Sequence, residues 1–264
     1  IADAIEKSHA EAVRDSLGWL ERHAVFTRLG AGGTRQVEVT GLLAVAFTHR
    51  DSRAGDPNLH THVAISNKVQ VADTPAAAGQ AGQWRALDGR PLHALAVAAS
   101  ERYNTRLEAL LTDRLDLRFA NRPGTAAGKR AVREIVGVDD RLTRVWAARR
   151  ASIDVRRAEL STTFQVEHGR PPSPVEAIKL AQQATLETRQ GKHAPRSHAE
   201  QRATWREQAA AALGGPPALE AMLSDLNRAA AHSPRPPAEV TAGWVADTAQ
   251  VVLETVQGSR ATWQ

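Results

Sequence analysis

Residues 47–62 read FTHRDSRAGDPNLHTH, and the polar middle of this stretch separates two runs that alternate as β-strands do. The first run covers residues 37–47, with a break at Gly41, and the second covers residues 60–71. Two strands joined by a loop of about ten residues predict an antiparallel pair. This pair, with helices on either side of it in the sequence, predicts an α+β fold built on an antiparallel sheet.

Three histidines occur where the two predicted strands approach the loop. Alternation along a strand puts His60 and His62 on one face, and His49 ends the preceding strand, opposite them if the pairing is antiparallel. Three neutral imidazoles then form a site for a borderline divalent cation, with positions left open for a substrate oxygen. In the connecting loop, Arg53 has a side chain suited to phosphate and Asp56 one suited to orienting an imidazole.

A structural interpretation of these histidines stays open at this point. The chain contains ten histidines, so one pair spaced by a single residue is unremarkable by itself. A histidine on a strand is more often a satisfied structural residue than a ligand. The shared face, the third histidine and the charged loop together favour the metal site.

The rest of the chain has mainly helical periodicity. Apolar spacing predicts helices over residues 1–25, 92–110 and 139–167, and a short strand over 115–121. The segment RPPSP at 170–174 is the strongest boundary signal. We therefore expect one domain over residues 1–168 and a mainly α-helical region over 169–264.

The composition excludes several classes of site. The chain has no cysteine, which rules out disulfides, thiolate zinc sites and a cysteine nucleophile. No run of 18 apolar residues occurs and the first 24 residues are charged throughout, so we expect a cytoplasmic protein without a membrane span or signal peptide. The chain begins at Ile1 and ends at Gln264 within a polar run, and we expect it to be a segment of a longer protein.

Positive charge is concentrated in one part of the sequence. The net charge is +5 with 29 arginines and 5 lysines, and residues 114–157 alone hold 12 basic and 5 acidic residues. These arginines either track nucleic-acid phosphates or form a solvated helix face in an Arg-biased chain. The candidates in this segment are Arg114, Arg118, Arg122, Arg130, Arg141, Arg144, Arg149 and Arg150. Arg28 and Arg53 are better placed for contacts near the histidines, although Arg28 also suits a helix C-terminus.

The histidine stretch resembles the three-histidine metal motif of TrwC/TraI-type conjugative relaxases, the MobF class of HUH endonucleases. The matching part of this stretch is SRAGDPNLHTH at 52–62, and three further motifs support the resemblance: TRLGAGG at 27–33, WRALD at 84–88 and RRASI at 149–153. It covers about residues 1–165, and the remainder resembles more weakly the helical connector that precedes a helicase-like region in such proteins.

The resemblance implies a ferredoxin-like palm of HUH type, in which His49, His60 and His62 bind a divalent metal ion. It implies site- and strand-specific nicking of DNA at a transfer origin through a 5′-phosphotyrosyl intermediate. The implied partners are single-stranded transfer-origin DNA, contacted by Arg28, Arg53, Arg149 and Arg150, and other transfer-complex proteins. The implied location is the bacterial cytoplasm, with passage into the recipient cell together with the DNA.

The sequence departs from the family pattern at the nucleophile. In the family, the nucleophilic tyrosines and the aspartate base lie upstream of the helix that opens this chain, and nothing here matches them. The single tyrosine, Tyr103, falls on the apolar stripe of a predicted helix and is interpreted as a packing residue. No Walker A loop is present. We therefore expect the 264 residues to bind metal and DNA without nicking alone, and a rolling-circle replication initiator or a non-catalytic DNA-binding remnant stays as an alternative.

Overall fold

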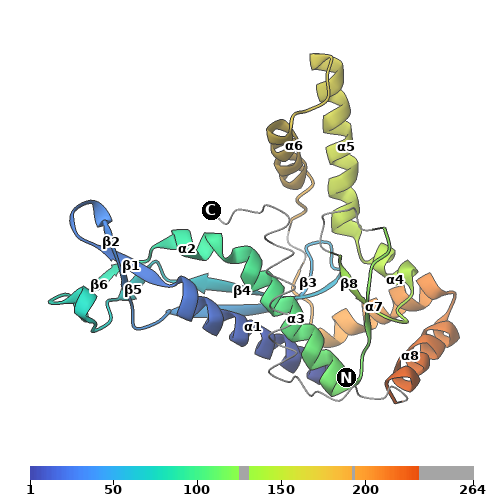
Figure 1. Ribbon diagram of the computed structural model, residues 1–264. Coiled ribbons are helices and arrows are strands. Elements are labelled where there is room, and N and C mark those ends of the chain that lie inside the picture. The colour runs from blue at the N-terminus through green and yellow to red at the C-terminus, as the bar shows by residue number, and fades with distance from the viewer. Residues whose placement is uncertain (125–130, 192–193, 232–264) are drawn as a thin grey trace, which may run out of the picture. The chain divides into compact units, whose positions relative to one another are not determined.

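The predicted antiparallel pair consists of β3 (Ala44–Asp51) and β4 (Pro57–Ile65) in a computed structural model that describes residues 1–124, 131–191 and 194–231 (Figure 1). His49 is opposite His60, and Phe47 is opposite His62. The pairing continues past an irregularity to Asp51 and Pro57, so the loop is residues 52–56 and is shorter than predicted. The strands extend into the polar residues because backbone hydrogen bonds form between polar residues as readily as between apolar ones. A pattern of alternating apolar residues does not reveal this extension.

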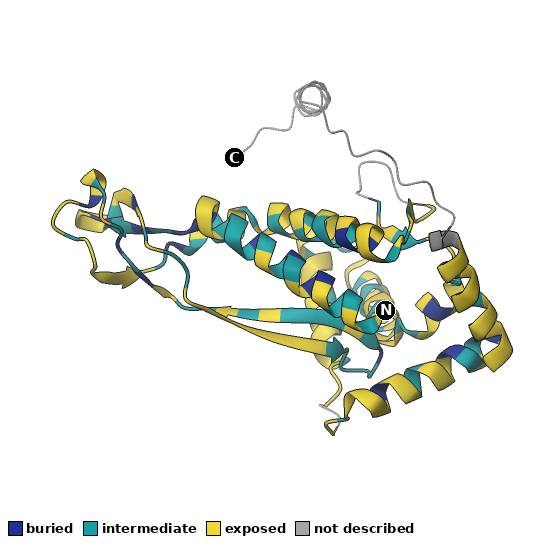
Figure 2. Ribbon diagram, turned by 90° about the horizontal axis from the view of Figure 1, so that it is seen from below, coloured by how far each residue is buried: buried dark blue, intermediate teal, exposed yellow. Residues whose placement is uncertain are grey.

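The two faces of this strand pair have different surroundings. Residues 44–49 of β3 are all exposed, and the strand is yellow over most of its length in Figure 2. On the opposite face, α1 (Ala2–Ala24) packs against β4 and against α3 (Ala96–Leu115). Within the described part of the chain, β3 pairs with β4 alone. The histidine-bearing strands are therefore supported mainly from one side.

The first helix confirms the prediction for residues 1–25. Its residues at helical spacing bury one stripe, which consists of Ser8, His9, Ala12, Ser16 and Ala24. Arg106 of α3 bridges Glu11 and Asp15 of α1 at 2.7 and 2.6 Å. The two helices are thus joined by small buried residues and by partly exposed ion pairs.

Three further antiparallel pairs are short. They are β1 (Phe26–Leu29) with β2 (Arg35–Glu38), β5 (Lys68–Gln70) with β6 (Trp84–Ala86), and β7 (Phe119–Asn121) with β8 (Arg133–Ile135). The sequence pattern does not predict β1, β6 and β8, because three or four residues are too few for alternation to show. A small core of Leu29, Val37, Val71 and Ala77 lies beside the first of these pairs.

The second half of the chain is mainly helical, as predicted. Its helices are α4 (Asp140–Val145), α5 (Ala148–His168), α6 (Pro174–Glu187), α7 (His198–Leu213) and α8 (Pro216–Ala231). The first half also contains the short helix α2 (Gly89–Ala94), directly before α3. A single helix over 139–167 is wrong, because the chain leaves the helical path at Trp146 and Ala147. At this break, the indole of Trp146 packs on the core formed by α4, α7 and α8 and donates to Gln208 at 3.0 Å.

The Pro-rich segment at 170–174 joins two helices that pack against each other, α5 and α6. Ser173 and Glu176 form a capping box that starts α6. Residues 1–231 cluster as one compact unit, and the predicted division after residue 168 stays a prediction. No described helix combines the length and apolar character needed to span a membrane. The mixed α+β fold is confirmed, and the part of the predicted helical region beyond residue 231 lies outside the described residues.

Candidate metal centre

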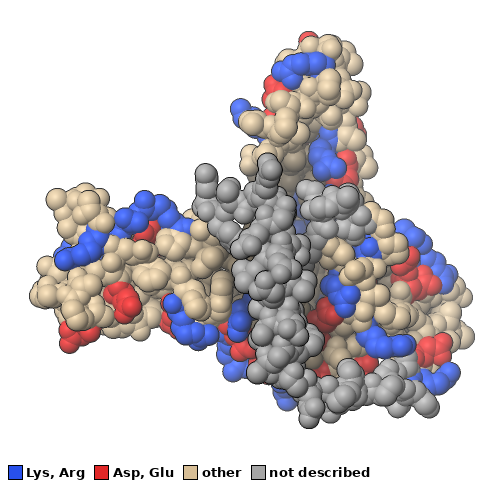
Figure 3. Space-filling model, viewed as in Figure 1, with Lys and Arg blue, Asp and Glu red and all other residues tan. Residues whose placement is uncertain are grey.

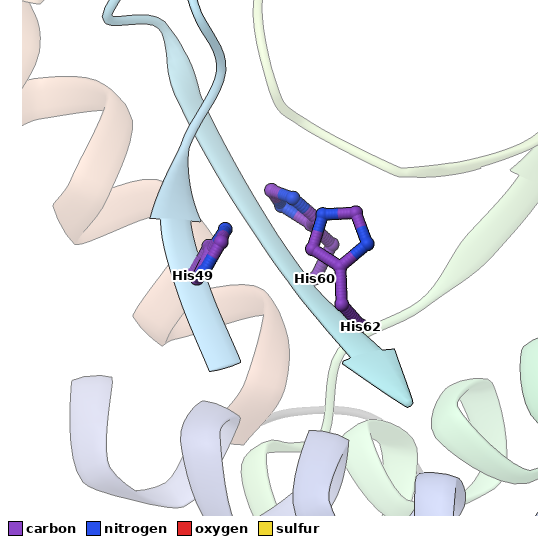
Figure 4. A group of neighbouring side chains, drawn as sticks. All are labelled: His49, His60 and His62. Atoms are coloured by element: carbon purple, nitrogen blue, oxygen red, sulfur yellow. The ribbon is translucent and has the colours of Figure 1, made fainter. Parts of the chain in front are cut away.

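Three imidazole rings converge on the exposed face of the β3–β4 pair (Figure 4). The ring centroids of His49 and His60 are 5.3 Å apart, those of His49 and His62 are 5.1 Å apart, and those of His60 and His62 are 5.0 Å apart. One nitrogen from each ring lies within 4.8 Å of the other two. The pleat causes this convergence, because cross-strand partners and residues two apart share a face.

The hydrogen bonding of His60 leaves one nitrogen for a metal. Its Nδ1 lies 2.8 Å from the backbone carbonyl oxygen of Asn58. A carbonyl can only accept, so Nδ1 carries the proton and Nε2 keeps its lone pair. A backbone carbonyl that holds one ring nitrogen while the other points to an ion is the usual arrangement of a ligating histidine.

The donor set fits a borderline divalent cation better than a hard one. Among the described residues the cluster consists of imidazoles alone. Three nitrogen ligands suit zinc and its neighbours in the transition series, whereas magnesium and calcium prefer oxygen. His49 and His62 are exposed, so the side of the cluster away from the strands is open to an additional ligand.

A pocket of about 700 Å³ adjoins the three rings. Its lining residues are His49, Asp51, Ser52, Arg53, Asn58, His60, His62, Arg149 and Pro195. Arg53 and Arg149 therefore line the same space as the three histidines. Arginine and a histidine-bound cation are both suited to phosphate oxygens.

The β3–β4 loop has its own internal hydrogen bonds. Ser52 donates its backbone N–H to the carbonyl of Asp56 at 2.8 Å, and Gly55 donates to the carbonyl of Ser52 at 3.0 Å. The buried Asp56 carboxylate accepts from the Ser52 hydroxyl at 3.4 Å. The predicted role of Asp56 in orienting an imidazole stays a prediction, and for His60 the orienting acceptor is the carbonyl of Asn58.

Helix α7 contacts this loop from a distance of about 150 residues in sequence. Trp205 donates its indole N–H to the carbonyl of Gly55 at 2.8 Å. Gln201, which is buried, donates to the Asp51 carboxylate at 2.9 Å, and Arg196 lies 3.3 Å from the same carboxylate oxygen. No local signal in the sequence links these three residues to the loop.

Helix α1 contacts both strands from the other face. Arg50, next to His49, forms a two-point ion pair with Glu6 at 2.8 and 2.6 Å, and Arg50 lowers the pKa of the Glu6 carboxyl. His9 lies one turn further along α1 and bonds to Thr61. Burial lowers the pKa of the His9 imidazole, which favours its neutral form. The sequence reasoning assigned no role to His9, although its place on the buried stripe is a signal for one.

The predicted DNA-binding arginines all have protein partners as well. Arg28 donates to the Asp88 carboxylate at 2.6 Å. Arg149 donates to the carbonyls of Thr188 and Thr185 at the end of α6, at 2.6 and 2.7 Å. Arg150 pairs with Asp154 at 2.6 Å, and Arg53 donates to the carbonyl of Gln190 at 3.5 Å. The structure brings Arg53 and Arg149 to the histidines, and a DNA contact by any of the four stays a prediction.

The basic segment at 114–157 is partly neutralised by acidic neighbours. The ion pairs are Arg114 with Glu11, Arg122 with Glu134, and Arg141 with Asp139. Arg130 lies outside the described residues. On the face drawn in Figure 3, blue and red side chains are interspersed rather than sorted into one basic area. A phosphate-tracking surface in this segment stays a prediction.

Tyr103 lies behind the strand pair and not in the pocket. Its hydroxyl is 2.7 Å from Nδ1 of His9, on the face of β4 opposite His60 and His62. The residue is half-buried in α3, and burial raises the pKa of its hydroxyl. These contacts account for Tyr103 as a structural residue.

Comparison with known proteins gives one consistent result. The family model for the TrwC relaxase matches residues 1–212. A metal-free structure of the conjugative relaxase TrwC in complex with oriT DNA is 25% identical with a TM-score of 0.60, and the match covers 78% of this chain and 64% of that one. A metal-bound structure of the same complex is 24% identical with a TM-score of 0.58, over 80% of this chain and 64% of that one.

A third structure, of TrwC with a 27-mer DNA comprising the recognition hairpin and the cleavage site, is 24% identical. Its TM-score is 0.56, and the match covers 78% of this chain and 65% of that one. This chain thus covers less than two thirds of the length of each of these structures. None of the curated proteins compared with it matches significantly.

Proposed function

Since the chain belongs to the TrwC relaxase family, we propose that it supplies the metal-binding part of a site that nicks one DNA strand at a transfer origin. The observation that carries this proposal is the convergence of His49, His60 and His62 beside a pocket bordered by two arginines. In this proposal the three imidazoles hold a divalent ion through one nitrogen each. Such an ion polarises the scissile phosphate and stabilises the charge that develops on it.

The proposed substrate is single-stranded DNA, and its phosphates lie in the pocket. Arg53 and Arg149 support this assignment, because both border the space next to the rings. Arg53 is the stronger candidate, since Arg149 already donates two hydrogen bonds to carbonyls of α6. Arg28 and Arg150 remain proposed contacts further from the rings. Complexes of oriT DNA with TrwC support DNA as the partner.

The proposed chemistry is a transesterification. A tyrosine hydroxyl gives its proton to an aspartate and attacks the scissile phosphorus. The bond from phosphorus to the 3′ oxygen breaks, and the leaving oxygen takes up one proton, which balances the proton that the tyrosine lost. The products are a 3′-hydroxyl end and a 5′-phosphotyrosyl bond. Tyr103 is not the proposed nucleophile, because its hydroxyl is bonded to His9 on the other side of the strands. We propose that the tyrosine and the aspartate lie outside these 264 residues.

We also propose that the protein works in the cytoplasm with other transfer proteins. In this proposal it accompanies the DNA into the recipient cell.

Metal binding tests the ligand assignment. Cobalt(II) is titrated into the purified chain and into the double variant His60→Ala, His62→Ala, and its visible absorption is followed. Removal of a residue that only hydrogen-bonds to a metal ligand lowers metal affinity by up to ~100-fold. We expect the double variant, which lacks two ligands, to lose more than that. The matched control is His93→Ala, an exposed histidine of α2, which should leave the affinity unchanged. Undiminished binding by the double variant overturns the assignment.

A second measurement tests the division of labour. The chain is incubated with metal and a labelled single strand that contains a transfer-origin cleavage site, and covalent adducts are sought on denaturing gels. We expect DNA binding that weakens as salt rises, and no adduct. An adduct would show that a nucleophile lies within the chain, and binding that is insensitive to salt would contradict the phosphate contacts.

A further inference from the structure

His9 is a buried histidine with both ring nitrogens engaged. Only 3% of the residue is exposed. Its Nδ1 lies 2.7 Å from the hydroxyl of Tyr103, and its Nε2 lies 2.7 Å from the hydroxyl of Thr61. A buried imidazole with two short bonds is held in one rotamer, because loss of either bond would leave a polar atom unsatisfied.

The hydrogen-bond chain continues into both histidine-bearing strands. The Thr61 hydroxyl lies 3.0 Å from the hydroxyl of Thr48, its cross-strand partner. Tyr103, His9, Thr61 and Thr48 thus connect α3, α1, β4 and β3 in that order. With a neutral imidazole, each contact in this network has one hydrogen-bond donor and one acceptor. The donors can all point from Tyr103 toward Thr48 or all in the reverse direction.

This hydrogen-bond network ends directly behind the proposed metal site. Thr61 lies between His60 and His62, and Thr48 precedes His49. Because side chains alternate along a strand, the two threonines point to the α1 side while the three histidines point to the open side. The network therefore fixes the backbone of both strands at the residues that set the spacing of the imidazoles.

We propose that His9 is a positioning residue for the metal centre, which it serves by fixing Thr61 and, through it, Thr48 relative to α1. This inference rests on the proposed function, in which His49, His60 and His62 hold the ion. The strand pair needs such support, because β3 is exposed over residues 44–49 and, in the described structure, has β4 as its single strand neighbour. A two-stranded sheet is marginal by itself, so the spacing of its side chains depends on what packs behind it.

Variants that remove one hydroxyl each test the role without deleting the imidazole. Thr61→Val keeps the β-branched shape that a strand favours, and Tyr103→Phe keeps the aromatic ring. Cobalt(II) is titrated into the purified chain and its d–d absorption spectrum is recorded at a temperature at which circular dichroism shows every variant folded. We expect Thr61→Val to weaken cobalt binding about 10-fold or more and to alter the spectrum. Tyr103→Phe should change both in the same direction and by less.

Ser16→Ala is the matched control. Ser16 is also buried on α1, but its hydroxyl donates to the carbonyl of Ala12 within the same helix. We expect this variant to keep the wild-type affinity and spectrum, since its bond does not reach the strands. A general loss of packing around α1 would make Ser16→Ala weaken cobalt binding as well, whereas the positioning role separates Ser16→Ala from the other two variants.

The outcomes distinguish this inference from the proposed function. Wild-type protein that binds no cobalt overturns both. If the wild type binds cobalt, and Thr61→Val and Tyr103→Phe bind it with the same affinity and spectrum, the positioning role alone is overturned. If His9→Ala folds, it should weaken cobalt binding more than either hydroxyl variant. If it does not fold, Thr61→Val and Tyr103→Phe decide whether the positioning role holds.

Discussion

His49 and His60 face each other directly across the β3–β4 ladder, with ring centroids 5.3 Å apart. The two residues belong to different strands, so their distance is a property of the register and not of either strand alone. A slip of one residue would turn one ring to the opposite face of the sheet. The contacts that hold the 52–56 loop, and those that hold each strand with one face toward α1, therefore determine the spacing of the rings in the proposed metal site.

Gly55→Ala should destabilise this loop. Gly55 has φ +82°, and a Cβ there would lie 3.0 Å from Nη2 of Arg196. A left-handed conformation costs a non-glycine residue about 1 kcal/mol, and the arginine end can move aside, so the expected loss is about 1–2 kcal/mol in the free energy of unfolding. Denaturant unfolding measures it. Gly191→Ala is the control, because a Cβ there meets nothing within 4 Å; equal effects of both changes would contradict the argument.

The sequence predicts the local parts of this site and misses the long-range ones. The three histidines, the antiparallel pair and the opening helix follow from alternation and helical spacing over a few residues. His9 contacts Thr61 across 52 positions and Tyr103 across 94, and Trp205 contacts Gly55 across 150. No periodicity within a window reports such pairs, since they depend on how the finished elements pack.

The arginines illustrate the same limit for charge. A net surplus within residues 114–157 suggests a basic face, but Arg114 and Arg122 are paired with Glu11 and with Glu134. Glu11 lies on α1, more than a hundred residues away, and its carboxylate enters the local charge balance only after folding. Composition counts charges along the chain, whereas binding depends on their sum in space.

The Arg28–Asp88 pair should make stability depend on acid pH. Hydrogen bonding to Arg28 lowers the pKa of Asp88 from 3.8 to about 2. The native state therefore binds this proton less readily than the unfolded chain, so the stabilisation is complete above about pH 5 and is lost as pH falls through about 2. We expect the pair to contribute about 1–2 kcal/mol, below the full linkage value because Arg28 is a third exposed.

Asp88→Asn tests this pH dependence. The variant should lose that increment at neutral pH and converge with the wild type near about pH 2, measured by urea unfolding across the acid range. Asp73→Asn is the control, because it removes a carboxylate from an exposed aspartate that lies outside the Arg28–Asp88 pair. A constant difference between Asp88→Asn and the wild type at all pH values would contradict the linkage.

Arg53→Gln should lower the affinity for single-stranded DNA and make that affinity depend less on salt concentration. Removal of one phosphate contact lowers the slope of log K against log salt by about 0.7 for a single strand. Fluorescence anisotropy with a labelled strand between low and moderate salt gives both quantities. Arg85→Gln removes a similar charge from β6, where Arg85 bonds to Gln80 and Gln83, and should have the smaller effect. A slope that Arg53→Gln leaves unchanged would remove Arg53 from the DNA contact.

Trp205→Phe should loosen the β3–β4 loop while it leaves the fold intact. The change keeps an aromatic ring in α7 and removes the indole N–H that donates to the carbonyl of Gly55 at 2.8 Å. A bond of this kind contributes about 1 kcal/mol, and here its loss falls on the five residues that join the ligand strands. The amides of Ser52 and Gly55, which bond within the loop, should exchange with solvent deuterium faster by about 5-fold.

Trp146→Phe is the matched control for this prediction. Its indole also donates to another element, at 3.0 Å to Gln208 of α7, but that exposed bond lies beside the core of α4, α7 and α8 and not at the loop. We expect faster exchange near α4 and α7 and no change at Ser52 and Gly55. Cobalt affinity should fall in Trp205→Phe and stay constant in Trp146→Phe, because only the first change frees the loop that fixes the register of His49 against His60. Equal exchange at Gly55 in both variants would mean that α7 touches the loop without restraining it.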